Sequence, residues 1–321
     1  MIQRTLAGRR PVSALCLGAM NFGTTTPPET AVAILDRFVA AGGTFIDTSN
    51  NYNQWHGHGG DSEELLGRWM RARGNRDDLV IATKAGARTT VPGDPADEHW
   101  EGLSAATVMT AVEGSLARLG TDRIDLYYAH LDDRRTPLDE TVGAFGQLAA
   151  NGVVDLVGCS NTAAWRLAQA RRSAADQGVE AYSVIQQRSS YLWPSPLAPA
   201  RRRLGSPFVT AANVEHFDYL AEHPDLTLVA YASLLGGAYA GKPLPAELGY
   251  AHSSAYARAE ELRRVAREVG ATAGQVVLAW MLHRPQVVPL FAVSTVAQLE
   301  EALEAVHLDL SDEHLRRLDT A

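Results

Sequence analysis

The chain has 321 residues, of which 46% are hydrophobic and 21% are charged, and its net charge is −8. This acidic balance argues against a nucleic-acid surface, so we interpret the short basic stretch at 201–203 as a solvated loop. No run of about 18 apolar residues occurs, which predicts no membrane span. The start of the chain lacks the apolar segment of a signal peptide. Two cysteines, Cys16 and Cys159, cannot form a disulfide framework and are expected to be buried thiols of a cytoplasmic protein.

Short apolar runs alternate with segments of helical periodicity along the whole chain. The predicted strands are 14–18, 44–47, 79–84, 124–130, 153–158, 182–186, 226–230 and 286–290. Three predicted helices begin near Pro28, at a cap formed by Ser62 and at Thr136-Pro137. Four further predicted helices cover 104–119, 162–177, 254–269 and 272–283. Two amphipathic segments follow at 295–305 and 311–319. The pattern is that of repeated strand–helix units.

Eight strands that are each followed by a helix predict one (β/α)8 barrel over residues 1–321, with helical segments at its C-terminal end. A doubly wound sheet is the competing fold, but it normally has fewer strands and a G-x-G-x-x-G first turn. Residues 17–23 lack that fingerprint. We interpret the irregular stretches 85–103 and 187–212 as loops that shape a substrate pocket. Surface excursions without a binding role are the alternative for both.

Four polar residues end or follow three of the predicted strands, namely Asp47, Tyr52, Lys84 and His130. The carboxyl ends of parallel barrel strands converge on one face, so these side chains are expected to meet there. A neighbouring ammonium lowers the pKa of a phenol, so Tyr52 is expected to protonate a developing alkoxide. Asp47 would orient Lys84, and His130 would hydrogen-bond a substrate oxygen. Each residue also has a structural reading, as a cap, a packed aromatic, a surface charge or a loop residue.

The segments around these residues resemble the aldo-keto reductase family, and the resemblance covers essentially the whole chain. Residues 47–52 are similar to its D-T-A-x-x-Y element, and residues 62–67 match the S-E-x-x-L-G that follows it. Residues 17–23, 81–84 and 119–130 resemble the family's first strand, its lysine and the stretch that carries its histidine. The resemblance implies a TIM barrel that reduces a carbonyl to an alcohol, with Tyr52 as the general acid.

The same resemblance implies a nicotinamide dinucleotide that is bound without a Rossmann domain. Residues 158–161 resemble the family's G-x-S-N, so Ser160, Asn161 and Gln186 would hold the nicotinamide carboxamide. Tyr231 would stack on the nicotinamide ring. The remaining implied cofactor contacts are Ser233, Leu234, Gly236 and Lys242 near the pyrophosphate, and Ser294, Gln298 and Glu301 near the adenosine.

The adenosine end departs from the family pattern. Ala292 replaces the usual glycine or lysine, and Ala302 replaces the usual asparagine. Gln298 stands where many NADPH-specific members carry arginine. A 2′-phosphate is best held by arginine or lysine, and residues 288–302 contain neither. NADP(H) remains favoured as the family default, with NAD(H) as the alternative.

We predict no metal site, because His56, His58 and Asp61 are interpreted as lining the mouth of the pocket.

The leading functional hypothesis is an NAD(P)H-dependent reductase of an aldehyde, ketone or keto-sugar, whose partner is a small carbonyl or alcohol. A cofactor-binding sensor or regulatory subunit with little turnover is the alternative. A barrel lyase or hydrolase would need a metal cluster or a carboxylate pair. The polar loops favour a hydroxylated substrate, such as a sugar or a natural-product ketone, and the oligomeric state stays open.

Overall fold

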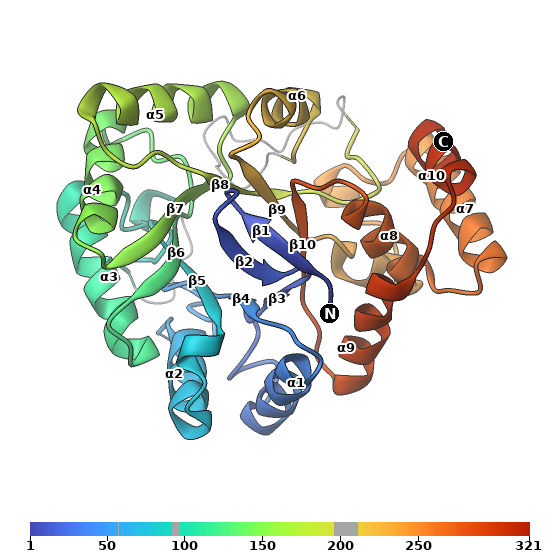
Figure 1. Cartoon of the computed structure of the whole chain (residues 1–321), viewed down its shortest axis with the longest axis horizontal. Coiled ribbons are helices and arrows are strands. Elements are labelled where there is room, and N and C mark those ends of the chain that lie inside the picture. The colour runs from blue at the N-terminus through green and yellow to red at the C-terminus, as the bar shows by residue number, and fades with distance from the viewer. Residues whose placement is uncertain (57, 92–96, 196–210) are drawn as a thin grey trace.

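Eight parallel strands close into a barrel in the computed structural model, which describes residues 1–56, 58–91, 97–195 and 211–321 (Figure 1). The strand order around the barrel is β10-β3-β4-β5-β6-β7-β8-β9. Their bounds are Cys16–Gly18 for β3, Phe45–Asp47 for β4, Val80–Ala85 for β5, Ile124–Ala129 for β6, Val154–Ser160 for β7, Val184–Arg188 for β8, Thr227–Tyr231 for β9 and Val287–Phe291 for β10. The predicted (β/α)8 fold is confirmed.

Helices surround the barrel and connect successive strands (Figure 1). They are α1 Pro28–Ala40, α2 Asp61–Arg73, α3 Ala105–Leu119, α4 Leu138–Ala150, α5 Ala164–Gln177, α6 Val214–Glu222, α7 Ser253–Glu268, α8 Ala273–Leu282, α9 Val296–Leu303 and α10 Asp312–Thr320. Short 3₁₀ turns are η1 Arg76–Asp78, η2 Asp97–His99, η4 Leu235–Ala240, η5 Ala246–Leu248 and η6 Glu304–His307. Among the described residues, no helix combines the length and apolarity that crossing a membrane requires.

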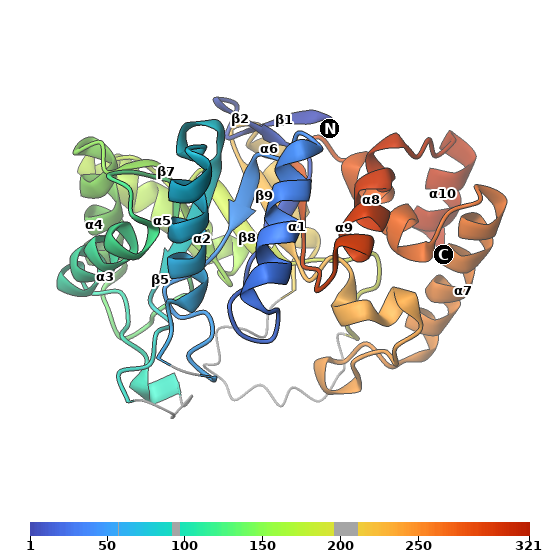
Figure 2. The ribbon, with the colours of Figure 1, turned by 90° about the horizontal axis from the view of Figure 1, so that it is seen from below.

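An N-terminal hairpin, β1 Gln3–Leu6 and β2 Arg10–Ser13, was absent from the sequence-based prediction. Its turn places Ala7 and Gly8 at φ 52° and 67°, a left-handed conformation that glycine adopts without strain. Leu6 and Val12 are fully buried in the apolar cluster that fills the barrel. In Figure 2 the hairpin lies at the top, away from the loop that follows β5. The hairpin therefore covers the amino end of the barrel and leaves the carboxyl end for a site.

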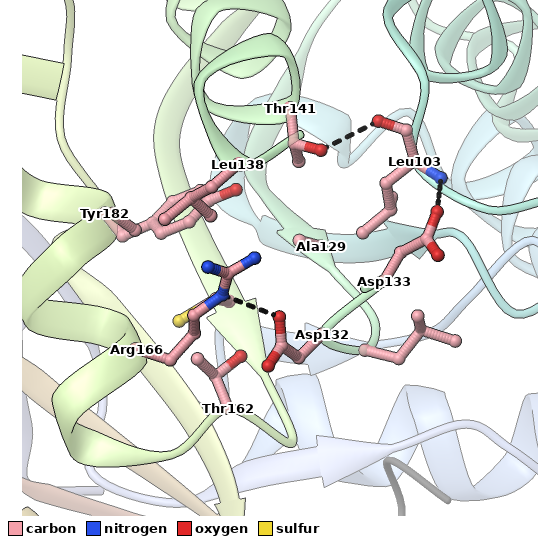
Figure 3. A pocket seen from close by; sticks show the side chains of 12 residues that line it. Leu103, Ala129, Asp132, Asp133, Leu138, Thr141, Thr162, Arg166 and Tyr182 are labelled. Atoms are coloured by element: carbon pink, nitrogen blue, oxygen red, sulfur yellow. Dashed lines mark hydrogen bonds and ion pairs between the residues drawn. The ribbon is translucent and has the colours of Figure 1, made fainter. Parts of the chain in front are cut away.

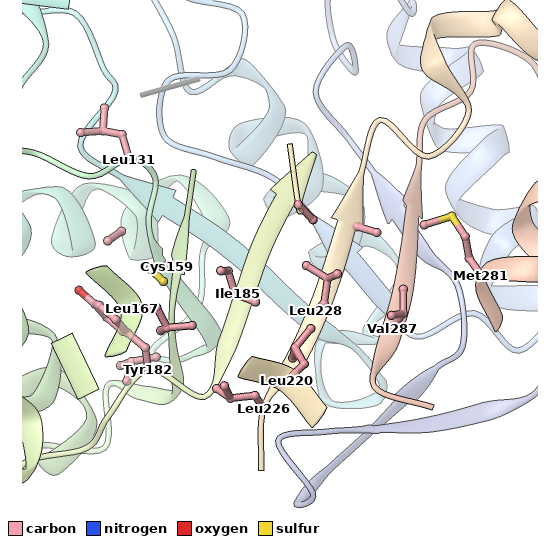
Figure 4. Close-up of a cluster of buried hydrophobic side chains, with 14 of the residues drawn as sticks. Leu131, Cys159, Leu167, Tyr182, Ile185, Leu220, Leu226, Leu228, Met281 and Val287 are labelled. Atoms are coloured by element: carbon pink, nitrogen blue, oxygen red, sulfur yellow. The ribbon is translucent and has the colours of Figure 1, made fainter. Parts of the chain in front are cut away.

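Side chains of each strand alternate between the barrel interior and the helix layer. In β6, Leu126 and Tyr128 belong to the interior cluster, while Tyr127 belongs to the cluster beneath the helices. Figure 4 shows part of this outer cluster, in which Ile185 and Cys159 lie among leucines. Fully burying one leucine contributes about 1.5–3 kcal/mol, so this layer supplies much of the driving force for closure. The prediction that both cysteines are buried is confirmed.

The cap predicted for the second helix was wrong. Helix α2 begins at Asp61 after Gly60, and Ser62 lies inside its first turn. The Ser62 hydroxyl donates to the Ala19 carbonyl at 2.7 Å and pairs with the Thr48 hydroxyl at 2.8 Å. Ser62 therefore joins α2 to the loops after β3 and β4. Helix α6 was also missed, because it buries only His216 and Leu220 and so shows a weak apolar pattern.

A small cavity of about 20 Å³ lies outside the barrel, next to β6, β7 and α5 (Figure 3). Asp132 accepts a hydrogen bond from Arg166 at 3.1 Å beside it, and Asp133 accepts one from the Leu103 amide at 2.9 Å. A volume of this size holds about one water molecule. These polar groups therefore fix the β6–α4 loop and do not form a substrate pocket.

Candidate active site

Asp47, Tyr52 and Lys84 meet at the carboxyl end of the barrel, as the sequence predicts. The Lys84 ammonium lies 2.5 Å from Asp47 Oδ1, 2.6 Å from the Thr48 carbonyl and 3.0 Å from the Tyr52 hydroxyl. Lys84 is 0% exposed and Asp47 is 1% exposed. An ammonium has three hydrogens to donate, and all three have an acceptor here. This satisfied cation is held directly beneath the Tyr52 oxygen.

The loop that carries Tyr52 is fixed by hydrogen bonds at both ends. The Tyr52 amide donates to the Ser49 carbonyl at 3.3 Å, and the Tyr52 carbonyl accepts from the Gly60 amide at 3.1 Å. The next residue, Asn53, has φ 74°, and its buried side chain donates to the Phe22 carbonyl at 3.1 Å. Strain of this kind persists only where surrounding contacts enforce it. The loop therefore presents the Tyr52 hydroxyl in one place.

Burial dominates the electrostatics of the phenol. It raises the pKa of Tyr52 to about 12, although Lys84 acts in the opposite direction. The predicted effect of the lysine is present, since Lys84 lowers the pKa of Tyr52, but burial outweighs it. Burial lowers the pKa of Lys84, but Asp47 and Tyr52 outweigh it and hold that pKa above its usual value. Burial also raises the pKa of Asp47, against the pull of Lys84. Lys84 thus stays an ammonium around neutral pH.

His130 follows β6 and stands beside Tyr52, with ring centroids 6.0 Å apart and planes at 78°. Burial, with a further contribution from Lys84, holds the pKa of His130 well below its usual range. The ring is therefore neutral at pH 7. Its Nδ1 lies 3.1 Å from the Ser49 hydroxyl. The structure thus brings all four predicted side chains together.

Three of the predicted nicotinamide contacts connect to these four residues by hydrogen bonds. Gln186 donates to Asp47 Oδ2 at 2.7 Å, and Asn161 donates to the His130 carbonyl at 2.9 Å. The Tyr231 hydroxyl in turn donates to Asn161 Oδ1 at 2.7 Å. Asn161 has φ 53°, so the side chain is presented by a left-handed residue immediately after β7. One network therefore spans the ends of β4 to β9.

The donor set on this face is suited to a nicotinamide. Ser160 Oγ accepts from Asn161 at 3.0 Å, which leaves its own hydrogen to donate to a carboxamide oxygen. Tyr231 offers an aromatic ring that is half-buried, and Arg188 lies over that ring at 5.4 Å. Amides and hydroxyls match the carboxamide, and an aromatic face matches the ring. The residues therefore fit the head of the cofactor that the sequence predicts.

The loop after β9 carries the residues that are predicted to contact the pyrophosphate. The Ser233 hydroxyl donates a hydrogen bond to the Leu290 carbonyl at 2.7 Å, and the Leu234 side chain packs on the core. Gly236 and Gly237 have φ 62° and 98°, which turns the chain sharply beneath the exposed Lys242. A Cβ on Gly237 would come within 3.1 Å of the Lys242 side chain. A flexible cation thus lies over a glycine turn, an arrangement suited to phosphate.

The predicted adenosine contacts lie on the exposed first turns of α9. Gln298 Oε1 accepts hydrogen bonds from the Ser294 amide at 2.8 Å and the Ser294 hydroxyl at 3.1 Å. Glu301 is exposed, and its carbonyl accepts from Gln275. Arg37 of α1 reaches α9 but pairs with Glu300 at 3.0 Å. The side-chain oxygen of Gln298 is therefore already hydrogen-bonded to Ser294.

Other predicted features fall around this face. His58 and Asp61 approach to 4.0 Å, and within the described ranges no cluster of three His, Cys, Asp or Glu could hold a metal. Residue 57, the basic stretch 201–203 and most of the 187–212 loop lie outside the described residues.

Several residues of the site were not singled out from the sequence. Ser49 and Asn51 lie inside the element that resembles D-T-A-x-x-Y, and Ser49 replaces its alanine. Arg188 shares the inward face of β8 with Gln186, because residues two apart in a strand point the same way. That alternation was a usable signal for Arg188. Ser49 and Asn51 had none, because the contact of Ser49 with His130 spans 81 positions and Asn51 is linked to His130 only through Ser49.

Comparison with known proteins identifies the family. The model for the aldo/keto reductase family matches residues 14–321. The chain belongs to the aldo/keto reductase family. It is 34% identical to the uncharacterized oxidoreductase YrpG of Bacillus subtilis, over 96% of this chain and 91% of that protein. It is 33% identical to the norsolorinic acid reductase stcV of Emericella nidulans, over 98% of this chain and 79% of that protein.

A further relative is norsolorinic acid reductase A of Aspergillus parasiticus, at 30% identity over 97% of this chain and 78% of that protein. Membership and these relatives establish that this aldo/keto reductase is an NAD(P)H-dependent oxidoreductase whose chemistry is carbonyl reduction. The family acts on small-molecule carbonyl compounds, which agrees with the predicted class of substrate.

Proposed function

We propose that this aldo/keto reductase reduces a ketone or aldehyde to an alcohol with Tyr52 as the general acid. The observation that carries the proposal is the buried chain from Asp47 through the Lys84 ammonium to the Tyr52 hydroxyl, at 2.5 and 3.0 Å. When bound, a reduced nicotinamide supplies the hydride that adds to the carbonyl carbon. The protein's own part is to place a proton next to the carbonyl oxygen.

Tyr52 arrives protonated, because its pKa of about 12 lies far above neutral pH. An alkoxide is a stronger base than a phenolate, so transfer of the Tyr52 proton to the developing alkoxide is favourable. The phenolate that results lies 3.0 Å from the Lys84 ammonium, which stabilises it. Asp47 keeps that ammonium charged and pointing at the phenol. His130 and Tyr52 then border the position of the substrate oxygens.

For the cofactor, Ser160, Asn161 and Gln186 would hold the carboxamide, and Tyr231 would cover one face of the ring. Their hydrogen bonds to each other and to the catalytic residues support this assignment. Backbone groups at Ser233, Leu234 and Gly236, together with Lys242, would take the pyrophosphate. Ser294, Gln298 and Glu301 would face the adenosine. NADP(H) is the preferred form, with NAD(H) as the alternative that kinetics must separate.

For the substrate, we favour the ketone of a hydroxylated natural product. Relatives that cover nearly the whole chain are norsolorinic acid reductases, and others are aldo-keto reductases named ausK. The loop after β4 adds polar groups at the mouth, such as Gln54, whose amide nitrogen donates to the Ala87 carbonyl at 3.2 Å. Residues 1–321 would act as one barrel domain.

Substitution Tyr52→Phe tests the proposal. General acid catalysis contributes about 10²–10⁴-fold, so kcat for a panel of aldehydes, ketones and keto-sugars should fall by that factor. Cofactor binding, followed by fluorescence titration with NADPH and NADH, should stay within about twofold. Tyr182→Phe is the matched control, because Tyr182 is buried outside the barrel interior and should leave both quantities unchanged.

Near-normal reduction by the Tyr52→Phe variant would refute the role of Tyr52. A wild-type protein that binds cofactor but turns over no member of the panel would instead favour the sensor hypothesis. Comparing kcat/KM for NADPH and NADH in the same assay decides the cofactor. A large NADH advantage would overturn the preference for NADP(H).

A further inference from the structure

Arg188 and Tyr231 stand side by side at the carboxyl end of the barrel. They end β8 and β9 and lie opposite each other in the register of that strand pair. Val184, four residues before Arg188, and Val229, two residues before Tyr231, belong to the apolar cluster inside the barrel. Because residues two apart in a strand point the same way, Arg188 and Tyr231 both face inward, toward the site.

The Arg188 guanidinium lies over the Tyr231 ring, with its central carbon 5.4 Å from the ring centroid. The hydroxyl of the same ring donates to Asn161 Oδ1 at 2.7 Å, which holds the ring in place. A cation over an aromatic face is attracted by the electrons of that face. One face of Tyr231 is therefore taken by Arg188, and the opposite face is the one on which a nicotinamide would stack.

Arg188 differs from Lys84 in that, within the described part of the chain, no carboxylate forms an ion pair with it. Its aromatic neighbours are Tyr231 and Tyr250. Burial raises the pKa of Tyr231 and raises the pKa of Tyr250 to about 12, although Arg188 acts in the opposite direction on both. Both phenols are therefore neutral at pH 7. The positive charge of Arg188 thus stands uncompensated beside the Tyr231 ring.

We propose that Arg188 makes the nicotinamide site select the reduced form of the cofactor, so that NAD(P)H binds more tightly than NAD(P)+. The inference rests on the cofactor placement proposed above, with Tyr231 against the nicotinamide ring. A reduced nicotinamide ring is neutral, whereas the oxidised ring carries one positive charge. The two forms are otherwise similar in shape, so a fixed cation beside the ring separates them by charge.

Two electrostatic effects of Arg188 act against the oxidised ring. Stacking adds about 3.5–4 Å to the 5.4 Å between Arg188 and the Tyr231 centroid, which places the two positive charges roughly 9 Å apart. At an effective dielectric constant of about 20, repulsion over this distance weakens binding roughly tenfold. Arg188 also draws the π electrons of Tyr231 to its own side, so the opposite face attracts a second cation less. Both effects vanish for the neutral, reduced ring.

Isothermal titration calorimetry of the full-length protein, without substrate, measures this selection for NADPH against NADP+ and for NADH against NAD+. In the wild type we expect the dissociation constant of the oxidised form to exceed that of the reduced form about tenfold. Arg188→Met removes the charge and should lower this ratio about tenfold, whereas Arg188→Lys keeps a cation and should keep most of it. Arg172→Met is the matched control, because Arg172 is an exposed cation on α5 that pairs with Asp176, and it should keep the whole ratio.

A purely structural role for Arg188 gives a different pattern. If Arg188 only held the Tyr231 ring, Arg188→Met would weaken both forms by the same factor. An unchanged ratio in Arg188→Met, or a wild type that binds both forms equally well, would therefore overturn the inference. Failure of the wild type to bind either form would refute the proposed cofactor and this inference together. Selective binding without any carbonyl reduction would refute the proposed reaction alone.

The selection also acts on turnover, because each cycle of carbonyl reduction binds the reduced cofactor and must release the oxidised one. Arg188 hastens that release and limits inhibition by the oxidised product. In assays of carbonyl reduction, the inhibition constant of NADP+ against NADPH should fall about tenfold in Arg188→Met and stay at the wild-type value in Arg172→Met. An inhibition constant that does not fall in Arg188→Met would contradict the inference.

Discussion

Replacing Lys84 by methionine should destabilise the protein strongly, and replacing its partner as well should restore part of the loss. Lys84 and Asp47 are 0% and 1% exposed and 2.5 Å apart. Removing one member of a buried pair leaves the other charge unpaired, which costs about 3–5 kcal/mol. We therefore expect Lys84→Met to lower the free energy of unfolding by that amount at pH 7.

The double variant Asp47→Asn/Lys84→Met contains no buried charge at this place. An asparagine oxygen can still accept from Gln186, which now donates to Asp47 at 2.7 Å. The Thr48 carbonyl and the Tyr52 hydroxyl lose their partner, at about 1 kcal/mol each. The double variant should thus lose about 2 kcal/mol, less than Lys84→Met alone, and the two substitutions should be non-additive.

Urea unfolding followed by circular dichroism and by tryptophan fluorescence measures these differences, provided both probes report one transition. The pH dependence supplies a separate check. In Lys84→Met the folded pKa of Asp47 is raised further, so the folded state takes up a proton before the unfolded state does. The Lys84→Met variant should therefore regain stability as the pH falls toward about 4. Equal losses in the single and double variants would refute the reasoning.

Three further changes test the rest of the site. Asn161→Gly keeps the left-handed backbone and removes the amide, so fluorescence titration should show roughly fivefold weaker NADPH binding, with a loss of about 1–3 kcal/mol of stability because the Tyr231 hydroxyl and the His130 carbonyl lose a buried partner. Gln298→Arg supplies a cation in the segment 288–302, which has no lysine or arginine and is proposed to face the adenosine, and should raise the NADPH-over-NADH ratio of kcat/KM about tenfold. His130 has a depressed folded pKa, so its contribution to stability is present above about pH 6.5 and is lost as the pH falls below it. His130→Gln should flatten that part of the curve of unfolding free energy against pH.

Most of the barrel could be predicted from the sequence, because its strands are short apolar runs bounded by polar residues and glycines. The hairpin was missed because β1 and β2 are four residues each and half exposed, so their alternation is too brief to stand out. Helix α6 was missed for a related reason, since nine residues with two buried side chains carry little periodicity. In both cases the element forms because it packs against the barrel, and a local sequence pattern does not show that tertiary contact.

The candidate site could be predicted because residues at the carboxyl ends of parallel strands converge on one face of the barrel. Asp47, Lys84 and His130 lie at such strand ends, although they are distant in sequence. What the sequence could not show is how deeply they are buried. Desolvation outweighs the effect of Lys84 on the pKa of Tyr52 and makes His130 neutral. Hydrogen-bond direction was equally hidden, because the sequence does not show which atom of Asn51 faces Ser49.

Burial also bears on the direction of the reaction. Burial raises the pKa of Tyr52 to about 12, so the phenol is protonated at pH 7. For reduction this is the required state, since the proton must be present when the alkoxide forms. For alcohol oxidation the same residue would have to start as a phenolate, which the desolvated site disfavours. Lys84 lowers that barrier but does not remove it, because its effect on the Tyr52 pKa is smaller than that of burial. At neutral pH the proposed acid, Tyr52, therefore starts in the protonated state that carbonyl reduction requires.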